Sequence, residues 1–177
     1  MKLDFWGNII HQGQNKIEKF DWILIFAYCT LSIFLLIIIS NSSTKSSYNS
    51  IILGFGILTT LYLYVFYFKK LRIFKLFLIW FLIGIIQFGI YLRYKHLEEF
   101  ASAIGGTYLN SLTSLIIMLV VLKSFDIIYR LIYKEHLIIT GNHVYGEGVD
   151  GRSIRILDIV FSMIGVMIVI IVSSMIF

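Results

Sequence analysis

The chain has 177 residues, of which 59% are hydrophobic and 14% are charged, and its mean hydropathy is +0.89. An ordinary soluble domain carries about 25% charged residues, so this composition excludes that class and predicts an integral membrane protein. The net charge is +5 and the one cysteine is Cys29. A single thiol excludes an intramolecular disulfide and a C-x-x-C redox site.

Five apolar segments are long enough to cross a bilayer, because about twenty helical residues span a hydrocarbon core of about 30 Å. The chain is therefore predicted to be an all-α membrane protein with five transmembrane helices. The predicted spans are residues 22–40, 51–68, 73–92, 104–122 and 156–177. The fourth is the weakest, because polar residues interrupt its outer half, namely Asn110, Ser111, Thr113 and Ser114.

Basic residues predict which way the spans face, since Lys and Arg near span ends stay cytoplasmic. With five spans, twelve basic residues fall on the side of the N-terminus, and three (Lys45, Arg93 and Lys95) fall on the other. This asymmetry predicts a cytoplasmic N-terminus and a C-terminus outside. Four domains follow: a cytoplasmic amphipathic segment at 1–21, helices one to four at 22–122, a cytoplasmic helix, hairpin and Gly-rich turn at 123–155, and helix five at 156–177.

The segment 1–21 is predicted to lie on the inner membrane surface as a short helix. Apolar residues recur there at helical spacing, from Phe5 and Ile9 to Ile17 and Phe20, opposite polar ones. A cleaved secretory signal is not expected, because the segment carries Asp4, Glu18 and Asp21 and the apolar run after it is too long. The first span is therefore expected to remain as an anchor.

Four basic residues without an acid among them separate the second and third spans: Lys69, Lys70, Arg72 and Lys75. One interpretation is a topology determinant whose side chains snorkel to the headgroups. The functional interpretation is contact with anionic lipid headgroups, worth about 1 kcal/mol for each basic residue.

The next charged stretch, residues 119–136, predicts a helix that continues from span four into the cytoplasm. A stripe of Lys123, Asp126, Arg130 and Lys134 follows helical spacing, with Asp126 placed to pair with Lys123 or Arg130. The stripe is interpreted as a solvated face, and this helix is the candidate partner-facing element. After it, the pair Gly141–Asn142 suits a two-residue turn, which predicts a hairpin of residues 137–140 with 143–145.

The string "GEGVDG" at 146–151 matches G-x-G-x-x-G, yet a dinucleotide site needs a second strand about twenty residues later. Those residues lie in the fifth span, so the glycines are interpreted as a turn that returns the chain to the bilayer. The nearby acids and histidines (His136, His143, Glu147 and Asp150) match no metal-site spacing. No catalytic, cofactor-binding or metal-binding residue is predicted.

A few polar side chains lie within the predicted spans, and they are candidates either for helix packing or for lining a pathway: Thr59, Thr60, Gln87 and Asn110. Three functions remain open. The first is a non-enzymatic subunit or regulator of a membrane protein complex, and the alternative is a homo-oligomeric channel or small-solute transporter. The third is an enzyme of a lipid or envelope pathway, with Asp126, Asp158 or His136 as acid or base.

The expected surroundings follow from the same residues. The protein is expected in the plasma membrane, or in the inner membrane of a Gram-negative source, as a multi-pass protein. Its expected partners are the lipid bilayer and either other membrane subunits or further copies of itself. Nucleic acid is not expected, because the basic residues are spread along one membrane face instead of clustering with aromatic residues on a soluble module.

Overall fold

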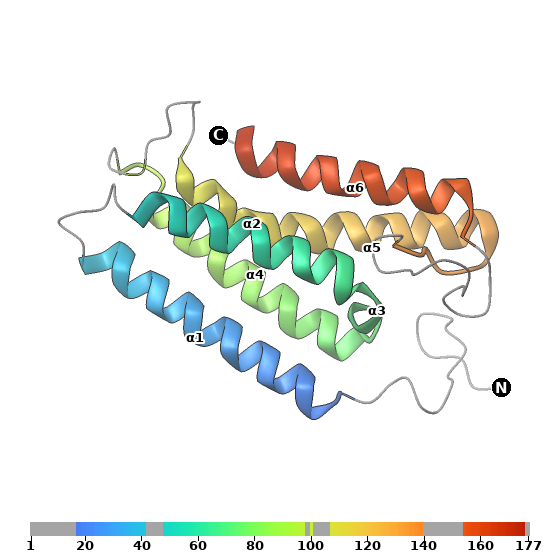
Figure 1. The fold of residues 1–177 in the computed structure, drawn as a ribbon, viewed down its shortest axis with the longest axis horizontal. Coiled ribbons are helices and arrows are strands. Elements are labelled where there is room, and N and C mark those ends of the chain that lie inside the picture. The colour runs from blue at the N-terminus through green and yellow to red at the C-terminus, as the bar shows by residue number, and fades with distance from the viewer. Residues whose placement is uncertain (1–16, 42–47, 98–99, 101–106, 140–153, 176–177) are drawn as a thin grey trace.

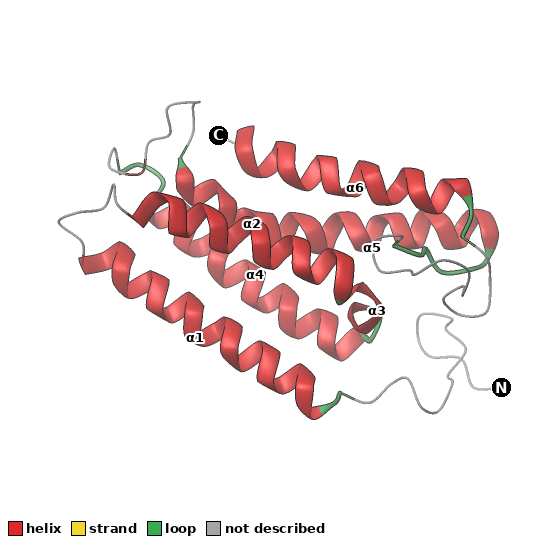
Figure 2. Cartoon of the chain, viewed as in Figure 1, coloured by secondary structure: helices red, strands yellow, loops and turns green. Residues whose placement is uncertain are grey.

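The computed structural model describes residues 17–41, 48–97, 100, 107–139 and 154–175. Within these ranges all the regular elements are helices, which confirms the predicted all-α class (Figure 2). In chain order they are α1 (Lys19–Asn41), α2 (Asn49–Phe66), α3 (Phe68–Leu71), α4 (Phe74–Tyr94), the 3₁₀ helix η3 (Tyr108–Thr113), α5 (Ser114–Tyr133) and α6 (Ile156–Met175).

The five long helices lie side by side in one bundle (Figure 1). Helices α1, α4 and α6 run one way, and α2 and α5 run the other way. Helix α5 packs on α2, α4 and α6, while α1 and α6 lie at opposite edges of the bundle. We call the end at which α1 and α6 begin the charged end, because it holds every acidic residue of the described part: Glu18, Asp21, Asp126, Glu135 and Asp158.

Three helices are long and apolar enough to cross a membrane: residues 19–40 of α1, all of α2 and all of α4. These helices make the chain compatible with a membrane protein. Residues 156–171 of α6 form a shorter apolar helix. Helix α5 differs from the others, because its second half carries Lys123, Asp126 and Arg130.

Helices α1 and α6 begin in the same way, with an aspartate three residues inside the helix. Asp21 accepts a hydrogen bond of 2.7 Å from the backbone N–H of Glu18, and Asp158 accepts one of 2.9 Å from that of Arg155. A carboxylate at this position satisfies a backbone donor that the helix itself leaves open. Both carboxylates are fully buried, so each also takes part in the packing of the charged end.

The predicted fourth span, residues 104–122, has different bounds in the structure. Its polar outer half forms the separate helix η3, and the α-helix starts only at Ser114 and runs on to Tyr133. The hydroxyls account for this break, because they bond to carbonyls of α2: Ser111 to Ile52 at 3.0 Å and Ser114 to Gly56 at 2.9 Å. The polar side chains that made this span look unsuitable for contact with lipid therefore join η3 and α5 to α2.

Helix α5 ends at Tyr133, and the residue that caps it, Lys134, has a φ of 57°, in the left-handed region. A residue in this conformation closes a helix and turns the chain away from the helix axis. The chain then returns along the bundle through Leu137, Ile138 and Ile139, which we call the return segment. The predicted strand is wrong for these three residues, since they form no strand. The predicted turn, the second strand and "GEGVDG" lie outside the described residues.

Candidate functional site

The return segment is buried among three helices at the charged end. Its side chains are at most 3% exposed. Its backbone groups find partners among side chains: Leu137 N–H donates to Asp126 at 3.2 Å, and Ile138 N–H donates to Asp158 at 3.0 Å. Because a buried backbone donor without a partner is costly, these two carboxylates determine where the segment lies.

Asp126 is the central acid of this site. Its Oδ1 accepts a hydrogen bond of 3.0 Å from Nδ1 of His136, and its Oδ2 lies 3.3 Å from Nε of Arg130. Burial acts to raise the pKa of Asp126, but the hydrogen bond from His136 and the charges of His136, Arg130 and Arg72 outweigh it and lower the pKa. Asp126 therefore stays ionised while almost buried.

The predicted solvated stripe on α5 is correct only in part. Lys134 is exposed and the Asp126–Arg130 pair is present, but Asp126 itself is buried against the return segment. Lys123 leans over the ring of Phe77 on α4, at 5.5 Å from its centroid. The spacing of the four residues is helical as expected, yet the face they form is closed by the chain that follows α5.

Asp158 and Ser162 hold the other side of the return segment. Ser162 lies one turn after Asp158 on α6, and its hydroxyl lies 2.6 Å from the carbonyl oxygen of Asp158 and 3.4 Å from that of Ile138. The side chain of Arg155 pairs with Glu135 at 3.1 Å and lies over the ring of Tyr133. Helix α6 is thus joined to the end of α5 by both charge and backbone contacts.

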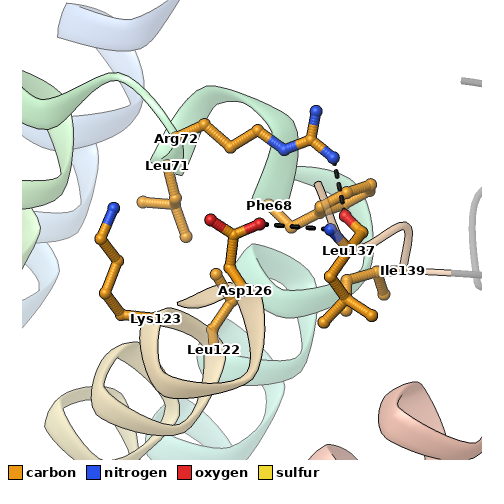
Figure 3. A pocket seen from close by; sticks show the side chains of 8 residues that line it. All are labelled: Phe68, Leu71, Arg72, Leu122, Lys123, Asp126, Leu137 and Ile139. Carbon is orange, nitrogen blue, oxygen red and sulfur yellow. Dashed lines mark hydrogen bonds between the residues drawn. The ribbon is translucent and has the colours of Figure 1, made fainter. Parts of the chain in front are cut away.

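Arg72 closes the site from the α3 side. Its Nη2 donates a hydrogen bond of 2.7 Å to the carbonyl oxygen of Leu137. A small pocket lies between Arg72, Lys123 and Asp126, with space for about one water molecule (Figure 3). The remaining lining is apolar: Phe68, Leu71, Leu122, Leu137 and Ile139. This space is too small for a metabolite or a lipid headgroup to enter.

A second acidic group lies where α1 begins. Asp21 accepts a hydrogen bond from the hydroxyl of Tyr67, and Lys70 lies 2.8 Å from Glu18 and 3.6 Å from Asp21. Burial and the adjacent Asp21 carboxylate raise the pKa of the Tyr67 hydroxyl, which therefore remains protonated and able to donate. The group joins α1 to α3 at the same end of the bundle as the return segment.

The four basic residues between α2 and α4 do not form one uniform patch. Lys70 is paired with acids of the chain, and Arg72 is bonded to the return segment. Lys69 and Lys75 are exposed. The sequence shows no acid within this stretch, but the fold brings Glu18 and Asp21 to it from α1.

The polar residues within the helices lie in separate interfaces. Gln87 accepts a hydrogen bond of 3.1 Å from Tyr28 and donates one of 3.2 Å to Ser32, so it joins α4 to α1. Thr60 and Ser114 share a hydrogen bond of 2.7 Å between α2 and α5. Thr59 bonds to the carbonyl of Phe55 in its own helix. Asn110, on η3, is buried.

Sequence reasoning missed the return segment and the Tyr67–Asp21 contact. A sequence signal was available for Asp158, which lies three residues inside the predicted start of helix five, where an acid can cap the helix and remain buried. Asp21 falls one residue before the predicted start of helix one and gave no such signal. The carboxylate–imidazole pair of Asp126 and His136 resembles an acid–base pair chemically. However, Asp126 already accepts from Leu137, and the pocket beside it has no room for a substrate.

Among the residues that the structure describes, no three His, Cys, Asp or Glu side chains are grouped so as to hold a metal ion. Compared with known proteins, the chain matches no family model, no curated protein and no solved structure. The assignment of function therefore depends on the geometry of the charged end and on the apolar helix surfaces.

Proposed function

We propose that this protein is a non-enzymatic subunit or regulator of a membrane protein complex in the plasma membrane. The observation that carries the proposal is the state of the polar groups at the charged end. Asp21, Asp126 and Asp158 each accept hydrogen bonds from the chain itself, and they hold three helix ends in place. These carboxylates hold the helices in a fixed arrangement, and a partner subunit requires such a fixed surface to bind.

The proposal includes five spans with the charged end in the cytoplasm. The fourth span consists of η3 with the first half of α5, and the fifth is α6, whose 20 residues at about 1.5 Å per residue reach about 30 Å, the thickness of the hydrocarbon core. Nine basic residues of the described part lie at the charged end: Lys19, Lys69, Lys70, Arg72, Lys75, Lys123, Arg130, Lys134 and Arg155. The opposite end carries Arg93 and Lys95, and this difference supports a cytoplasmic charged end.

The channel alternative is supported less well. A pathway requires polar side chains that converge on one axis, whereas Gln87 faces α1 and Thr60 faces α5. Both residues are buried within a single chain, so they do not line a pore between copies. The enzyme alternative is disfavoured by the small space beside Asp126.

The surface offered to a partner within the membrane is the outer face of α6. Met163 and Met167 lie one turn apart there, 63% and 58% exposed. Flexible Met side chains adapt to an opposing helix, and on the inner side of α6 Gly165 packs closely against Tyr64. The outer face of α6 is therefore available to a partner, while its inner face packs against the rest of the bundle.

The test is purification from native membranes in mild detergent, with size and composition analysis of the wild type and of the variant Met163→Phe/Met167→Phe. We expect a complex larger than one chain, containing a second membrane protein in fixed ratio, and we expect the variant to lose that protein while remaining folded. The matched control is Phe26→Leu on the exposed face of α1, which should retain it. A particle containing only copies of this chain, with ion flux in liposomes, would refute the proposal in favour of a channel.

A further inference from the structure

The turn between α2 and α4 lies at a boundary between apolar and charged surface. Helix α2 ends at Phe66 and α4 begins at Phe74, and both phenylalanines are exposed. Each belongs to a helix that is apolar and long enough to cross a membrane. The exposed residues between them, Lys69 first, therefore lie at the level at which lipid phosphate groups meet the hydrocarbon.

The basic residues at this boundary differ in their contacts with the rest of the chain. Glu18 and Asp21 pair with Lys70, which removes Lys70 from the charge available to a ligand. The oxygens of Asp126 contact His136, Leu137 and Arg130, and the residue is 5% exposed. Lys69 and Lys75 remain exposed.

Helix α5 adds a further positive charge to the same boundary. Arg72 and Lys123 both line the small pocket and lie on either side of the Asp126 carboxylate (Figure 3). The ammonium group of Lys123 lies over the ring of Phe77, so Lys123 packs beside the first turns of α4, the helix that carries Lys75. We call the set of Lys69, Arg72, Lys75 and Lys123 the basic rim.

We propose that the basic rim binds the headgroup phosphate of an acidic glycerophospholipid of the adjacent leaflet, at the mouth of the small pocket. Charge complementarity and the level of the exposed phenylalanines both favour a lipid, whose acyl chains would lie along Phe66 and Phe74. The proposal changes the set suggested by sequence, because Lys70 leaves it and Lys123 joins it. It goes beyond the proposed function, since it requires no partner protein.

The experiment measures lipid binding by the full chain purified in mild detergent. Phosphatidylglycerol, phosphatidylcholine and inorganic phosphate are each titrated, and bound lipid is measured by native mass spectrometry together with the thermal unfolding midpoint. We expect phosphatidylglycerol alone to bind and to raise the midpoint. In Lys69→Gln/Lys75→Gln, and separately in Lys123→Gln, the affinity should fall about fivefold for each lost charge, the equivalent of about 1 kcal/mol.

The matched control lies at the opposite end of the bundle. Lys95 is held over the ring of Tyr91 at 5.7 Å, much as Lys123 is held over Phe77 at 5.5 Å, so Lys95→Gln removes a similar charge without touching the rim. The control should bind phosphatidylglycerol as the wild type does. Equal binding by the rim variants, or equal binding of phosphatidylcholine, would overturn the proposal. If inorganic phosphate raised the unfolding midpoint to the same extent, the proposal that the bound phosphate belongs to a lipid would be rejected.

Discussion

The carboxylate of Asp126 and the imidazole of His136 lie 3.0 Å apart, although one residue is on α5 and the other follows its end. This contact brings the chain back over the helix it has just left. Leu137 N–H then donates to the same carboxylate oxygen, at 3.2 Å. One ionised side chain therefore determines the path of a buried segment without regular secondary structure.

The ionisation of Asp126 predicts a dependence of stability on pH. Because the fold lowers the pKa of Asp126 below its unfolded value of about 3.9, its contribution is complete above about pH 4 and is lost as the pH falls through the folded pKa. We expect the wild type to lose more stability below pH 4 than Asp126→Asn does, measured by unfolding in detergent. Equal acid sensitivity of the two proteins would contradict this role of Asp126.

Removing Asp158 should loosen α6. In Asp158→Ala the backbone N–H groups of Ile138 and Arg155 lose their acceptor, and the buried Ile138 donor left without one costs about 1–3 kcal/mol. We expect a lower free energy of unfolding, and faster hydrogen exchange at Ile138 measured by mass spectrometry. Ser40→Ala, which removes an exposed hydroxyl from α1, is the control and should change neither. Unchanged exchange at Ile138 would show that the return segment is held by other contacts.

Two glycines on α2 offer a matched comparison. A Cβ added at Gly56 would collide with the backbone of Ser111, whereas one added at Gly54 would meet nothing within 4 Å. We expect Gly56→Ala to destabilise the protein by about 1–3 kcal/mol, because neither backbone can move without disturbing η3. Gly54→Ala should leave the stability unchanged or raise it slightly. Equal effects in thermal unfolding would argue against the close packing of η3 on α2.

Gln87 distinguishes packing from conduction. Gln87→Leu removes the hydrogen bonds to Tyr28 and Ser32, and we expect it to destabilise the α1–α4 contact by about 0.6–2 kcal/mol. Liposome ion flux should be the same for this variant and the wild type. Thr59→Val is the control, because its hydroxyl bonds within its own helix, and it should cost less. A change in flux in Gln87→Leu would support the channel alternative.

Hydropathy was sufficient to predict the helical class and the approximate course of α1, α2 and α4. It misplaced the start of α5, because Ser111 and Ser114 have polar side chains that are nevertheless buried, where they bond to carbonyls of α2. Local sequence cannot show such pairing, since the partners lie more than fifty residues away.

The charged end was harder to predict for a related reason. Asp126 was expected on a solvated stripe, because helical spacing places it beside Lys123 and Arg130. Spacing within one helix does not show that the chain will fold back and cover that stripe. Similarly, residues 69–75 contain no acid, and it is the packing of α1 that brings Glu18 to Lys70.

The central claim is that the charged end faces the cytoplasm, and single-cysteine labelling tests it most directly. Starting from Cys29→Ser, a cysteine is introduced as Lys134→Cys at the charged end or as Lys95→Cys at the opposite end. We predict that a membrane-impermeant maleimide labels the Lys95→Cys protein in intact cells, and labels the Lys134→Cys protein only after permeabilisation. Labelling of the Lys134→Cys protein in intact cells would contradict the account.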